Sequence, residues 1–240
     1  PPSQIDRRRF LKTGSAATLS FATMSALGAS GKRIRIGQIG TRHAHAEGKM
    51  ATMRKLSDLF EVVGIVEPNT ELRERARRRD TYAGLRWMSE GELLGTPGLE
   101  IVAIENDMTE LASTGLRCLR AGMHIHLYKP PGESMAMYRE LHRVATEREL
   151  VVQLGYMFRY NPAFQFVFHA AREGWLGEIT EVHGQIGKHA SPELRRELAR
   201  FPGGGMYELG CHLVDAVVAI LGAPEQIHSF DNRTGGDGAA

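Results

Sequence analysis

Cysteine is scarce in this sequence, and no apolar run after residue 31 is long enough to cross a bilayer. Cys118 and Cys211 are the two cysteines among 240 residues. Each falls within an expected helix, which indicates buried free thiols rather than a disulfide bridge. A membrane-spanning helix needs about 20 consecutive apolar residues. These absences argue against a disulfide scaffold and against an integral membrane protein.

An excess of charge of one sign is also lacking. The formal net charge is +2, and residues 1–31 carry four basic residues and one acid. The remainder therefore has a net charge of −1. Proteins that bind nucleic acid usually present a strongly basic face, so we expect no nucleic acid partner. The basic run at 73–80 alternates with acids on an expected helix, which indicates a solvated helix face.

Short apolar segments alternate with helical patterns through the first two thirds of the chain. At 42% hydrophobic residues, 240 residues can build one large or two modest cores. We expect strands at 33–36, 61–66, 101–104, 124–127 and 151–154, and helices at 71–79, 109–121 and 134–147. This alternation predicts an α/β fold with a doubly wound parallel sheet of the Rossmann type over residues 32–154. The ends of its strands would meet in one crevice.

The stretch 33–68 predicts a dinucleotide site. A strand runs into the glycine loop 37–43, an amphipathic segment follows, and a second strand ends at Glu67. Gly37 and Gly40 permit a tight turn, Thr41 and His43 begin the helix, and an acid at Glu67 can accept from ribose hydroxyls. The loop reads G-x-x-G-x-x-H rather than G-x-G-x-x-G, so an ordinary strand-to-helix turn is the alternative. His43 in place of a small residue indicates a looser turn around a pyrophosphate.

The N-terminus has the features of an export signal. Residues 6–12 read Asp-Arg-Arg-Arg-Phe-Leu-Lys, which matches the twin-arginine pattern, and an apolar stretch rich in alanine and serine follows to about residue 29. A chance basic cap on a short helix is the alternative. Residues 1–31 are thus predicted to direct export across the bacterial inner membrane, and the protein is expected in the periplasm or another extracytoplasmic space.

From residue 155 the pattern changes, which predicts a second α/β domain over 155–240. We expect helices at 162–174 and 192–200, a strand of an antiparallel sheet at 178–187, a long helix at 206–221 and a further strand from 226. One exposed strand and a pair of helices cannot bury the face of a sheet. The second domain is therefore expected to be incomplete, which suggests a partial sequence or a truncated gene product.

Lys129 is the first candidate for chemistry. It follows Tyr128 and precedes Pro130 at the end of the strand 124–127, where a doubly wound fold places its ligands. An ammonium group there can hold the nicotinamide ribose and a substrate hydroxyl, or donate a proton. The alternative is a surface lysine before a proline turn.

A second group lies on the helix after Gly203, Gly204 and Gly205. Glu208, His212 and Asp215 stand at i, i+4 and i+7, so in a regular α-helix they share one face. A carboxylate beside an imidazole can orient it and adjust its pKa for taking a proton from an alcohol. A surface pair of acid and histidine is the alternative. No third histidine stands at standard spacing, so we predict no metal site.

Arg159 and Asn161 lie at the junction of the two expected domains and could reach substrate in the cleft between them. Arg159 could equally tie the domains together. His124 and His126 alternate to one face of an expected strand, which favours a role in core contacts.

Together these motifs resemble the glucose–fructose oxidoreductase / inositol dehydrogenase (Gfo/Idh/MocA) family from about residue 32 to residue 231. The resemblance is carried by the loop 37–43, the strand end 66–69, the segments 121–130 and 158–162, and the helix 203–215. The family's Glu-Lys-Pro signature is represented by Tyr128-Lys129-Pro130, in which the acid is lost. Its Asp-x-x-x-His pair is represented by Glu208 and His212.

The resemblance implies a Rossmann domain followed by an α/β domain with an open, mostly antiparallel sheet, through which many members form dimers or tetramers. It implies NAD(P)-dependent oxidation or reduction of a sugar, polyol or related compound. Lys129 would position substrate and, with Pro130, lie against the cofactor. His212 would be the general acid/base, Glu208 its orienting carboxylate, and Asp215 a supporting contact to substrate.

Glu67 favours NAD over NADP, because a carboxylate would repel a 2′-phosphate, and NADP is the alternative cofactor. Two features support a different interpretation, in which the protein is a catalytically silent sugar- or nucleotide-binding relative. These are Tyr128 in place of the acid and the short second domain. A metal-dependent hydrolase that uses the face 208–215 is the remaining hypothesis.

Overall fold

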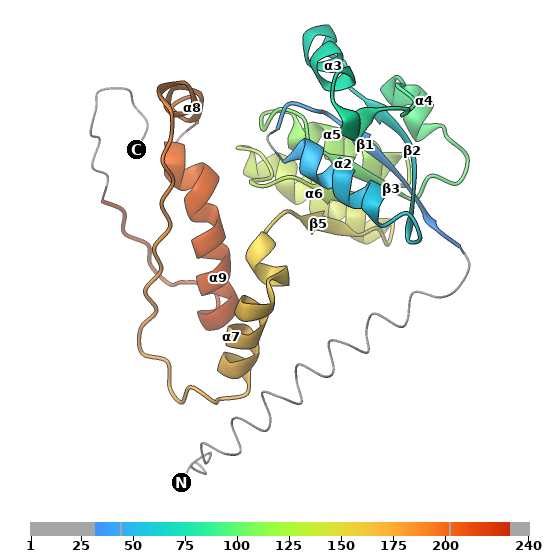
Figure 1. Ribbon diagram of the computed structural model, residues 1–240. Helices are drawn as coiled ribbons and strands as arrows, with labels where there is room; N and C mark the ends of the chain where they lie inside the picture. Colours follow the sequence, from blue (N-terminus) through green and yellow to red (C-terminus); the bar gives the residue numbers. More distant parts are fainter. Residues whose placement is uncertain (1–31, 44, 202, 231–240) are drawn as a thin grey trace.

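The computed structural model describes residues 32–43, 45–201 and 203–230. The predicted export signal, residues 1–31, lies outside this part of the chain. A larger body built on a parallel sheet stands beside a smaller group of three helices, α7 (Pro162–Arg172), α8 (Pro192–Leu198) and α9 (Cys211–Leu221) (Figure 1).

The sheet has five parallel strands in the order β2-β1-β3-β4-β5. They are β1 (Ile34–Ile39), β2 (Phe60–Val66), β3 (Ile101–Ile104), β4 (His124–Leu127) and β5 (Val152–Leu154). Trp87 extends the outer edge by a parallel bridge to Ile65 of β2. The α/β fold with a Rossmann-type parallel sheet is thus confirmed. The chain winds one way from β1 to β2 and the other way from β3 onward, which opens a crevice at the carboxyl ends of β1 and β3.

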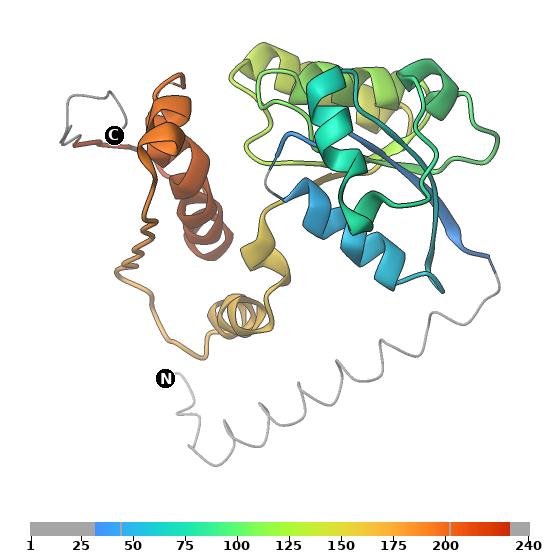
Figure 2. The same cartoon turned by 45° about the horizontal axis from the view of Figure 1, so that its top comes forward.

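Helices cover both faces of the sheet, and each face has its own hydrophobic core (Figure 2). Met50 and Met53 of α2 (Ala46–Lys55) pack on one face against Ile36 and Ile65. The other face is covered by α5 (Leu111–Arg120) and α6 (Met135–Glu147), whose Leu111, Leu119 and Leu141 are fully buried. Each buried leucine contributes roughly 1.5–3 kcal/mol to stability. Two cores on opposite faces explain why β3, at the centre of the sheet, is apolar throughout.

Side-chain caps fix where the smaller helices begin. Asn69 accepts from the N–H of Leu72 at the start of α3 (Thr70–Arg77), directly after the strand end at Glu67. Ser89 and Glu92 form a reciprocal capping box at the start of α4 (Glu90–Leu94). The caps fix the residue at which each helix begins. The short connection between β2 and α3 therefore keeps Glu67 at the edge of the crevice.

The second half differs from the prediction. After β5 come η2 (Met157–Tyr160), α7, α8, η3 (Met206–Gly210) and α9, and no strand forms within 155–201 or 203–230. The predicted strands at 178–187 and from 226 are therefore wrong for the described residues, and the expected antiparallel sheet is not confirmed. The physical reason is that no neighbouring strand offers backbone partners, so the 178–187 segment runs along α9 as coil, with Gly184 beside Leu213. The proposed domain limits at 31/32 and 154/155 remain predictions.

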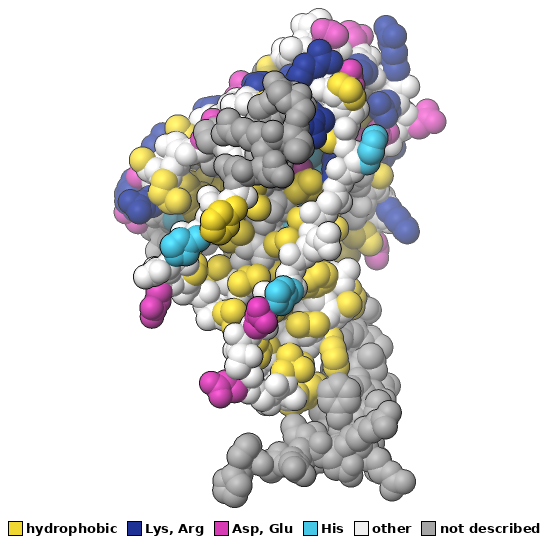
Figure 3. Space-filling view, turned by 90° about the vertical axis from the view of Figure 1, so that its left-hand side faces the viewer, with side chains coloured by type: hydrophobic (Ala, Val, Ile, Leu, Met, Phe, Trp, Pro, Cys, Tyr) yellow, Lys and Arg dark blue, Asp and Glu magenta, His cyan; other side chains and the backbone are white. Residues whose placement is uncertain are grey.

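Apolar side chains gather on the outer face of this second half (Figure 3). Ile227 and Phe230, which follow α9, are 80% and 97% exposed. Exposed apolar groups on this scale mark a surface that another layer normally covers. Within the described residues, no helix is both long and apolar enough to pass through a membrane.

Candidate active site

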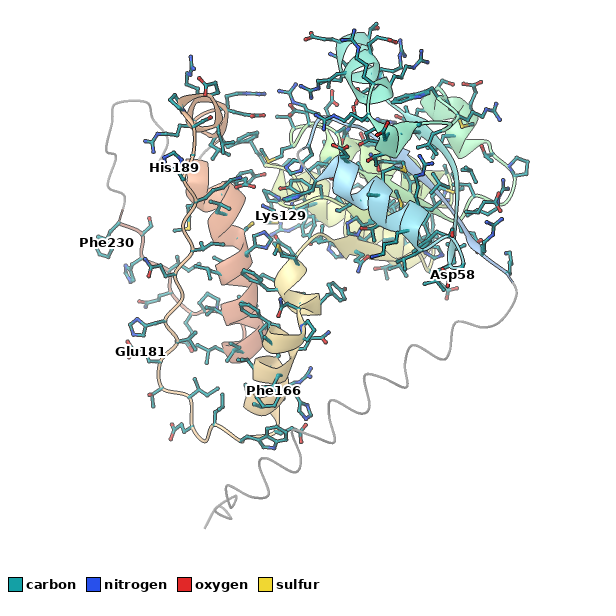
Figure 4. All side chains as sticks on the ribbon, in the orientation of Figure 1. Asp58, Lys129, Phe166, Glu181, His189 and Phe230 are labelled. Carbon is teal, nitrogen blue, oxygen red and sulfur yellow. The ribbon has the colours of Figure 1, made fainter. Side chains whose placement is uncertain are left out.

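Candidate groups from distant parts of the sequence meet at the carboxyl edge of the sheet. Gly40 follows β1, Glu67 follows β2, and Lys129 stands two residues after β4. Lys129 lies between the sheet domain and the helices of the second half (Figure 4). The predicted crevice therefore brings together the loop, the acid and the lysine.

Gly37 does not belong to the turn. It lies inside β1, between partners Gly64 of β2 and Val102 of β3. A Cβ at Gly37 would come within 2.6 Å of the Leu93 side chain, so the glycine makes room for α4. Gly37 therefore lies in the strand and not in the turn, because β1 continues three residues beyond its expected end, and its contact with the cofactor remains a prediction. The turn begins at Gly40.

Gly40 makes the turn that leads into α2. Its φ is +93°, and an added Cβ would lie 2.3 Å from the backbone nitrogen of Asn106, after β3. No L-side chain fits that conformation without strain. Gly40 thus brings the loops after β1 and β3 into direct backbone contact at the point where the sheet order reverses.

Replacing Gly40 with alanine is expected to lower the free energy of unfolding by about 2 to 4 kcal/mol, since positive φ and overlap with backbone add together. Gly48→Ala is the matched control. Gly48 lies within α2 with open space around its Cα, so alanine there should stabilise by about 0.5–1 kcal/mol. Urea titration of both variants measures the difference. Equal stability of the two would contradict the proposed turn geometry.

Glu67 is buried and fixes the loop. Its Oε2 accepts from the N–H and hydroxyl of Thr41 at 2.7 and 2.8 Å, and Oε1 accepts from the N–H of Asn69 at 3.0 Å. Oε1 retains a lone pair for a ribose hydroxyl. Cavities of about 280 and 400 Å³ flank this acid, the first lined by Thr41 and His43 and the second by Glu67 itself. Thr41 and Glu67 therefore form one hydrogen-bonded unit beside these cavities.

Lys129 is 2% exposed and is held by Glu208. Its Nζ donates to Glu208 Oε1 at 3.0 Å and to the Glu208 carbonyl at 2.5 Å. The hydroxyl of Tyr128 lies 3.4 Å from the same Oε1. Burial, and then the charge of Glu208, raises the pKa of Tyr128, so it is a neutral donor. The lysine is thus buried, charged and paired across the two halves of the chain, which excludes the surface-lysine alternative.

Glu208 does not pair with His212, contrary to the prediction from their spacing. Residues 206–210 form the π-helix η3, in which the backbone hydrogen bond spans five residues instead of four. This wider turn changes the angle between Glu208 and His212 and directs the carboxylate to Lys129. Nδ1 of His212 is buried without a hydrogen-bond partner among the described residues. The role of Glu208 as the orienting group of His212 is therefore not supported.

His212 lies against aromatic rings. Its ring centroid is 5.9 Å from that of Tyr156 and 5.3 Å from that of Phe158. Burial, and then the charge of Lys129, lowers the pKa of His212. A neutral imidazole with an unpartnered nitrogen, close enough to Lys129 to respond to its charge, can accept a proton or a hydrogen bond.

Arg159 and Asp215 form a bidentate ion pair, with Arg159 NH2 at 2.7 Å from Oδ1 and Nε at 2.8 Å from Oδ2 of the carboxylate. The pair ties η2 to α9 and lines, with Pro130, a cavity of about 720 Å³. Asn161 instead caps α7, accepting from the N–H of Ala163 at 2.9 Å. Asp215 and Asn161 thus have structural partners, and their contact with substrate remains a prediction.

A buried charged network was missed by sequence reasoning. Lys49 of α2 lies 2.5 Å from Oε1 of Glu105, which follows β3 and is 0% exposed. The same ammonium contacts Nε2 of His126, whose Nδ1 lies 3.0 Å from Gln153 of β5. The one available signal was an acid directly after a buried strand, the same signal that identified Glu67. His126 therefore binds polar partners rather than only filling the core.

Three histidines near the loop are kept neutral by their surroundings. Burial, and then neighbouring positive charge, lowers the pKa of His43 to about 3 and lowers that of His45. Burial, and then Lys49, lowers the pKa of His126 to about 4. The ring of His43 stacks on Tyr128 with centroids 3.4 Å apart. His43 thus lies on the wall of the site beside Lys129.

Acidification is expected to destabilise the fold between pH 6.5 and about 3. In this window the unfolded histidines bind protons that His43 and His126 exclude in the folded state, so stability is present above pH 6.5 and falls as the pH falls. Each contributes a slope of up to about 1.4 kcal/mol per pH unit. Urea titrations from pH 7.5 to 4.5 measure it. His126→Gln should reduce the slope, and His183→Gln, at an 84% exposed side chain, should not; equal slopes in both would refute the assignment.

Comparison with known proteins identifies the family of both parts of the chain. Residues 34–156 match the oxidoreductase family with an NAD-binding Rossmann fold. This part is an NAD(P)-binding domain, in agreement with the predicted cofactor. Residues 164–238 match the GFO/IDH/MocA C-terminal domain. The chain belongs to the Gfo/Idh/MocA family.

Individual relatives are distant. A trans-1,2-dihydrobenzene-1,2-diol dehydrogenase of Bos taurus is 28% identical over 59% of this chain and 43% of its own length. A scyllo-inositol 2-dehydrogenase (NADP(+)) of Bacillus subtilis is 23% identical over 57% and 38%. The E. coli oxidoreductase YhhX is 25% identical over 64% and 44%. The chain spans about half the length of the curated relatives that it matches.

Solved structures agree on the fold. The structure of YhhX has a TM-score of 0.63 at 22% identity, covering 80% of this chain and 55% of its own. A 3-ketoreductase of Actinomadura kijaniata, in complex with TDP-benzene and NADP, has a TM-score of 0.51 at 26% identity, covering 62% and 46%. Within the described part of the chain, no group of three potential ligands is placed to hold a metal ion.

Proposed function

We propose that the protein is an NAD(P)-dependent oxidoreductase that transfers a hydride between nicotinamide and a carbon bearing a hydroxyl or carbonyl group in a sugar, polyol or related diol. The observation that carries the proposal is the buried, ion-paired Lys129 at the carboxyl edge of the sheet. His43 lies against Tyr128, the neighbour of Lys129, and His212 follows Glu208, the partner of Lys129, one turn along the same helix.

The residues at the sheet edge fit a dinucleotide. Gly40 supplies the tight turn, α2 begins directly after the loop, and Glu67 presents a buried carboxylate beside two cavities. When bound, the nicotinamide supplies the hydride donor or acceptor. The residues of this chain have to hold the substrate, exclude water and move the proton.

Lys129 is placed to donate a hydrogen bond to the substrate oxygen and to stabilise the negative charge that develops there. Glu208 keeps the ammonium in position and compensates the cost of burying it. His212, neutral and with Nδ1 unpartnered, would accept the hydroxyl proton in the oxidative direction and return it in reduction. Arg159 and Asp215 support this arrangement by fixing α9 against η2.

The cofactor preference follows from Glu67. A carboxylate at the end of β2 accepts from ribose hydroxyls and repels a 2′-phosphate, which favours NAD, with NADP as the alternative. Two of the relatives are dehydrogenases of a dihydrodiol of benzene and of scyllo-inositol. Both compounds are cyclic vicinal diols or polyols, so a cyclic polyol is the substrate class that we propose.

Two further proposals concern the whole protein. The twin-arginine pattern at 6–12 supports export to an extracytoplasmic space, with the cofactor acquired before export. The exposed apolar face of the second half supports homo-oligomer formation through that side of the molecule.

Nucleotide binding and turnover test the proposal. Titration of the purified full-length chain with NADH, followed by nicotinamide fluorescence, should give saturable binding. Addition of NAD with a panel of cyclic polyols, aldoses and dihydrodiols should produce absorbance at the NADH wavelength with at least one compound. Absence of nucleotide binding would refute the assignment. Binding without turnover of any compound in the panel, in either direction, would instead indicate a silent nucleotide-binding relative.

A further inference from the structure

The glycine loop has an arginine where a dinucleotide-binding loop normally has its second glycine. Counted from the end of β1, the G-x-G-x-x-G positions are occupied by Gly40, Arg42 and His45. In the usual pattern the second glycine lets the backbone approach the pyrophosphate closely. A side chain as large as arginine prevents that approach and replaces it with a cation.

The backbone of this loop is already committed to partners within the protein. A pyrophosphate at a helix start normally accepts from free backbone N–H groups. Here four of them donate to protein acceptors, at 2.7 to 3.4 Å: Gly40 to Val66 O, Thr41 to Glu67 Oε2, His43 to Glu105 O, and His45 to His43 Nδ1. A bound diphosphate therefore needs a donor other than these amides.

Arg42 is placed to be that donor. Its Nε lies 2.9 Å from Oδ2 of Asp107, in the loop after β3, and its NH2 lies 3.7 Å from Oε1 of Glu197 on α8. The side chain is 41% exposed. Its guanidinium thus stands over the opening between β1 and β3, with a close carboxylate on one side and a looser one on the other.

We propose that the guanidinium of Arg42 binds the pyrophosphate of the dinucleotide, giving up Glu197 while Asp107 keeps it oriented. This inference rests on the proposed nucleotide-dependent function and names the residue that holds the diphosphate. A planar guanidinium matches two phosphate oxygens with two parallel N–H donors, which an ammonium cannot do. The exposed contact with Glu197 is the weaker of the two and is the one exchanged.

Comparison of ligands with and without a diphosphate isolates this contact. We expect Arg42→Ala to weaken binding of NADH and of ADP at least about tenfold, and to leave adenosine unchanged, because only the charge-assisted contact is lost. Arg42→Lys should recover part of the affinity. Glu197→Gln should strengthen ADP binding up to about fivefold by removing a competing carboxylate. Isothermal titration at two salt concentrations measures the affinities of the wild type and of these three variants.

Arg120→Ala is the matched control. Arg120 ends α5 at the opposite edge of the sheet, is 59% exposed and has one carboxylate partner, Glu140 at 3.3 Å. It should bind ADP as the wild type does. If Arg42→Ala and Arg42→Lys retain the wild-type ratio of ADP to adenosine affinity, the proposal is overturned while the cofactor assignment stands. If the wild type binds NADH but turns over no substrate, hydride transfer fails and the role of Arg42 stands.

Discussion

Replacing Lys129 with methionine is expected to lower kcat by about a thousandfold while leaving the Kd for NADH within a few fold of the wild-type value. The change removes the group that we propose as donor to the substrate oxygen, and acid–base and electrostatic contributions of this kind are each worth about 10²- to 10⁴-fold. Methionine nearly preserves the length and apolar stem of the lysine.

Steady-state rates with the best substrate of the panel, together with NADH titration, measure the two quantities separately. Lys55→Met is the control, since Lys55 lies at the exposed end of α2 and takes no part in the site. Its kcat should equal that of the wild type. A Lys129→Met enzyme that retains more than a tenth of wild-type kcat would remove the lysine from the chemistry.

Replacing Glu208 with glutamine is expected to lower the free energy of unfolding by about 3 kcal/mol. Glutamine keeps the shape but leaves the ammonium of Lys129 buried without a counter-charge, and breaking a buried ion pair from one side costs about 3–5 kcal/mol. Glutamine keeps one hydrogen bond, which places the expected cost at the lower end. Urea denaturation at pH 7.5 measures the difference.

A second substitution separates the loss of charge from the loss of shape. Lys129→Met in the Glu208→Gln background removes both charges, so that no buried ammonium is left without a counter-charge. The double variant should recover at least half of the lost stability, whereas Glu147→Gln, at a 58% exposed side chain, should change it by less than about 0.5 kcal/mol. A double variant no more stable than Glu208→Gln would show that the charge of Glu208 is not what matters.

The parts of the site that could be predicted are those that depend on strand order. Glu67 stands directly after β2 and Lys129 two residues after β4, and parallel strands bring such positions to one edge. Predicting where each strand ends was therefore enough to place both residues at this edge of the sheet. The same reasoning, applied to Glu105 after β3, would have found the network with Lys49 and His126, but an isolated acid in a loop gave no sign of its burial.

The errors arise where local pattern does not decide the structure. The pattern G-x-x-G-x-x-H predicts that Gly37 opens the turn, but the buried second half of β1 continues through it to Ile39, and no change of pattern marks the end of the strand. Residues 178–187 alternate like a strand, and yet a strand forms only where a neighbour supplies backbone partners. The spacing of Glu208 and His212 assumed a regular α-helix, and the sequence gives no indication of a π turn between them.

That π turn divides the continuous helix formed by η3 and α9 into two parts with different ion-pair partners. Within the π turn, Glu208 pairs with Lys129 of the sheet domain. After it, on α9, Asp215 pairs with Arg159 of η2. A π turn is equivalent to one extra residue inserted into an α-helix. Deleting a single residue from η3 would therefore rotate the carboxylate away from its partner while leaving the rest of the helix in register. A change of length in η3 would thus alter the position of Glu208 relative to Lys129 and leave the sheet domain and the rest of α9 unchanged.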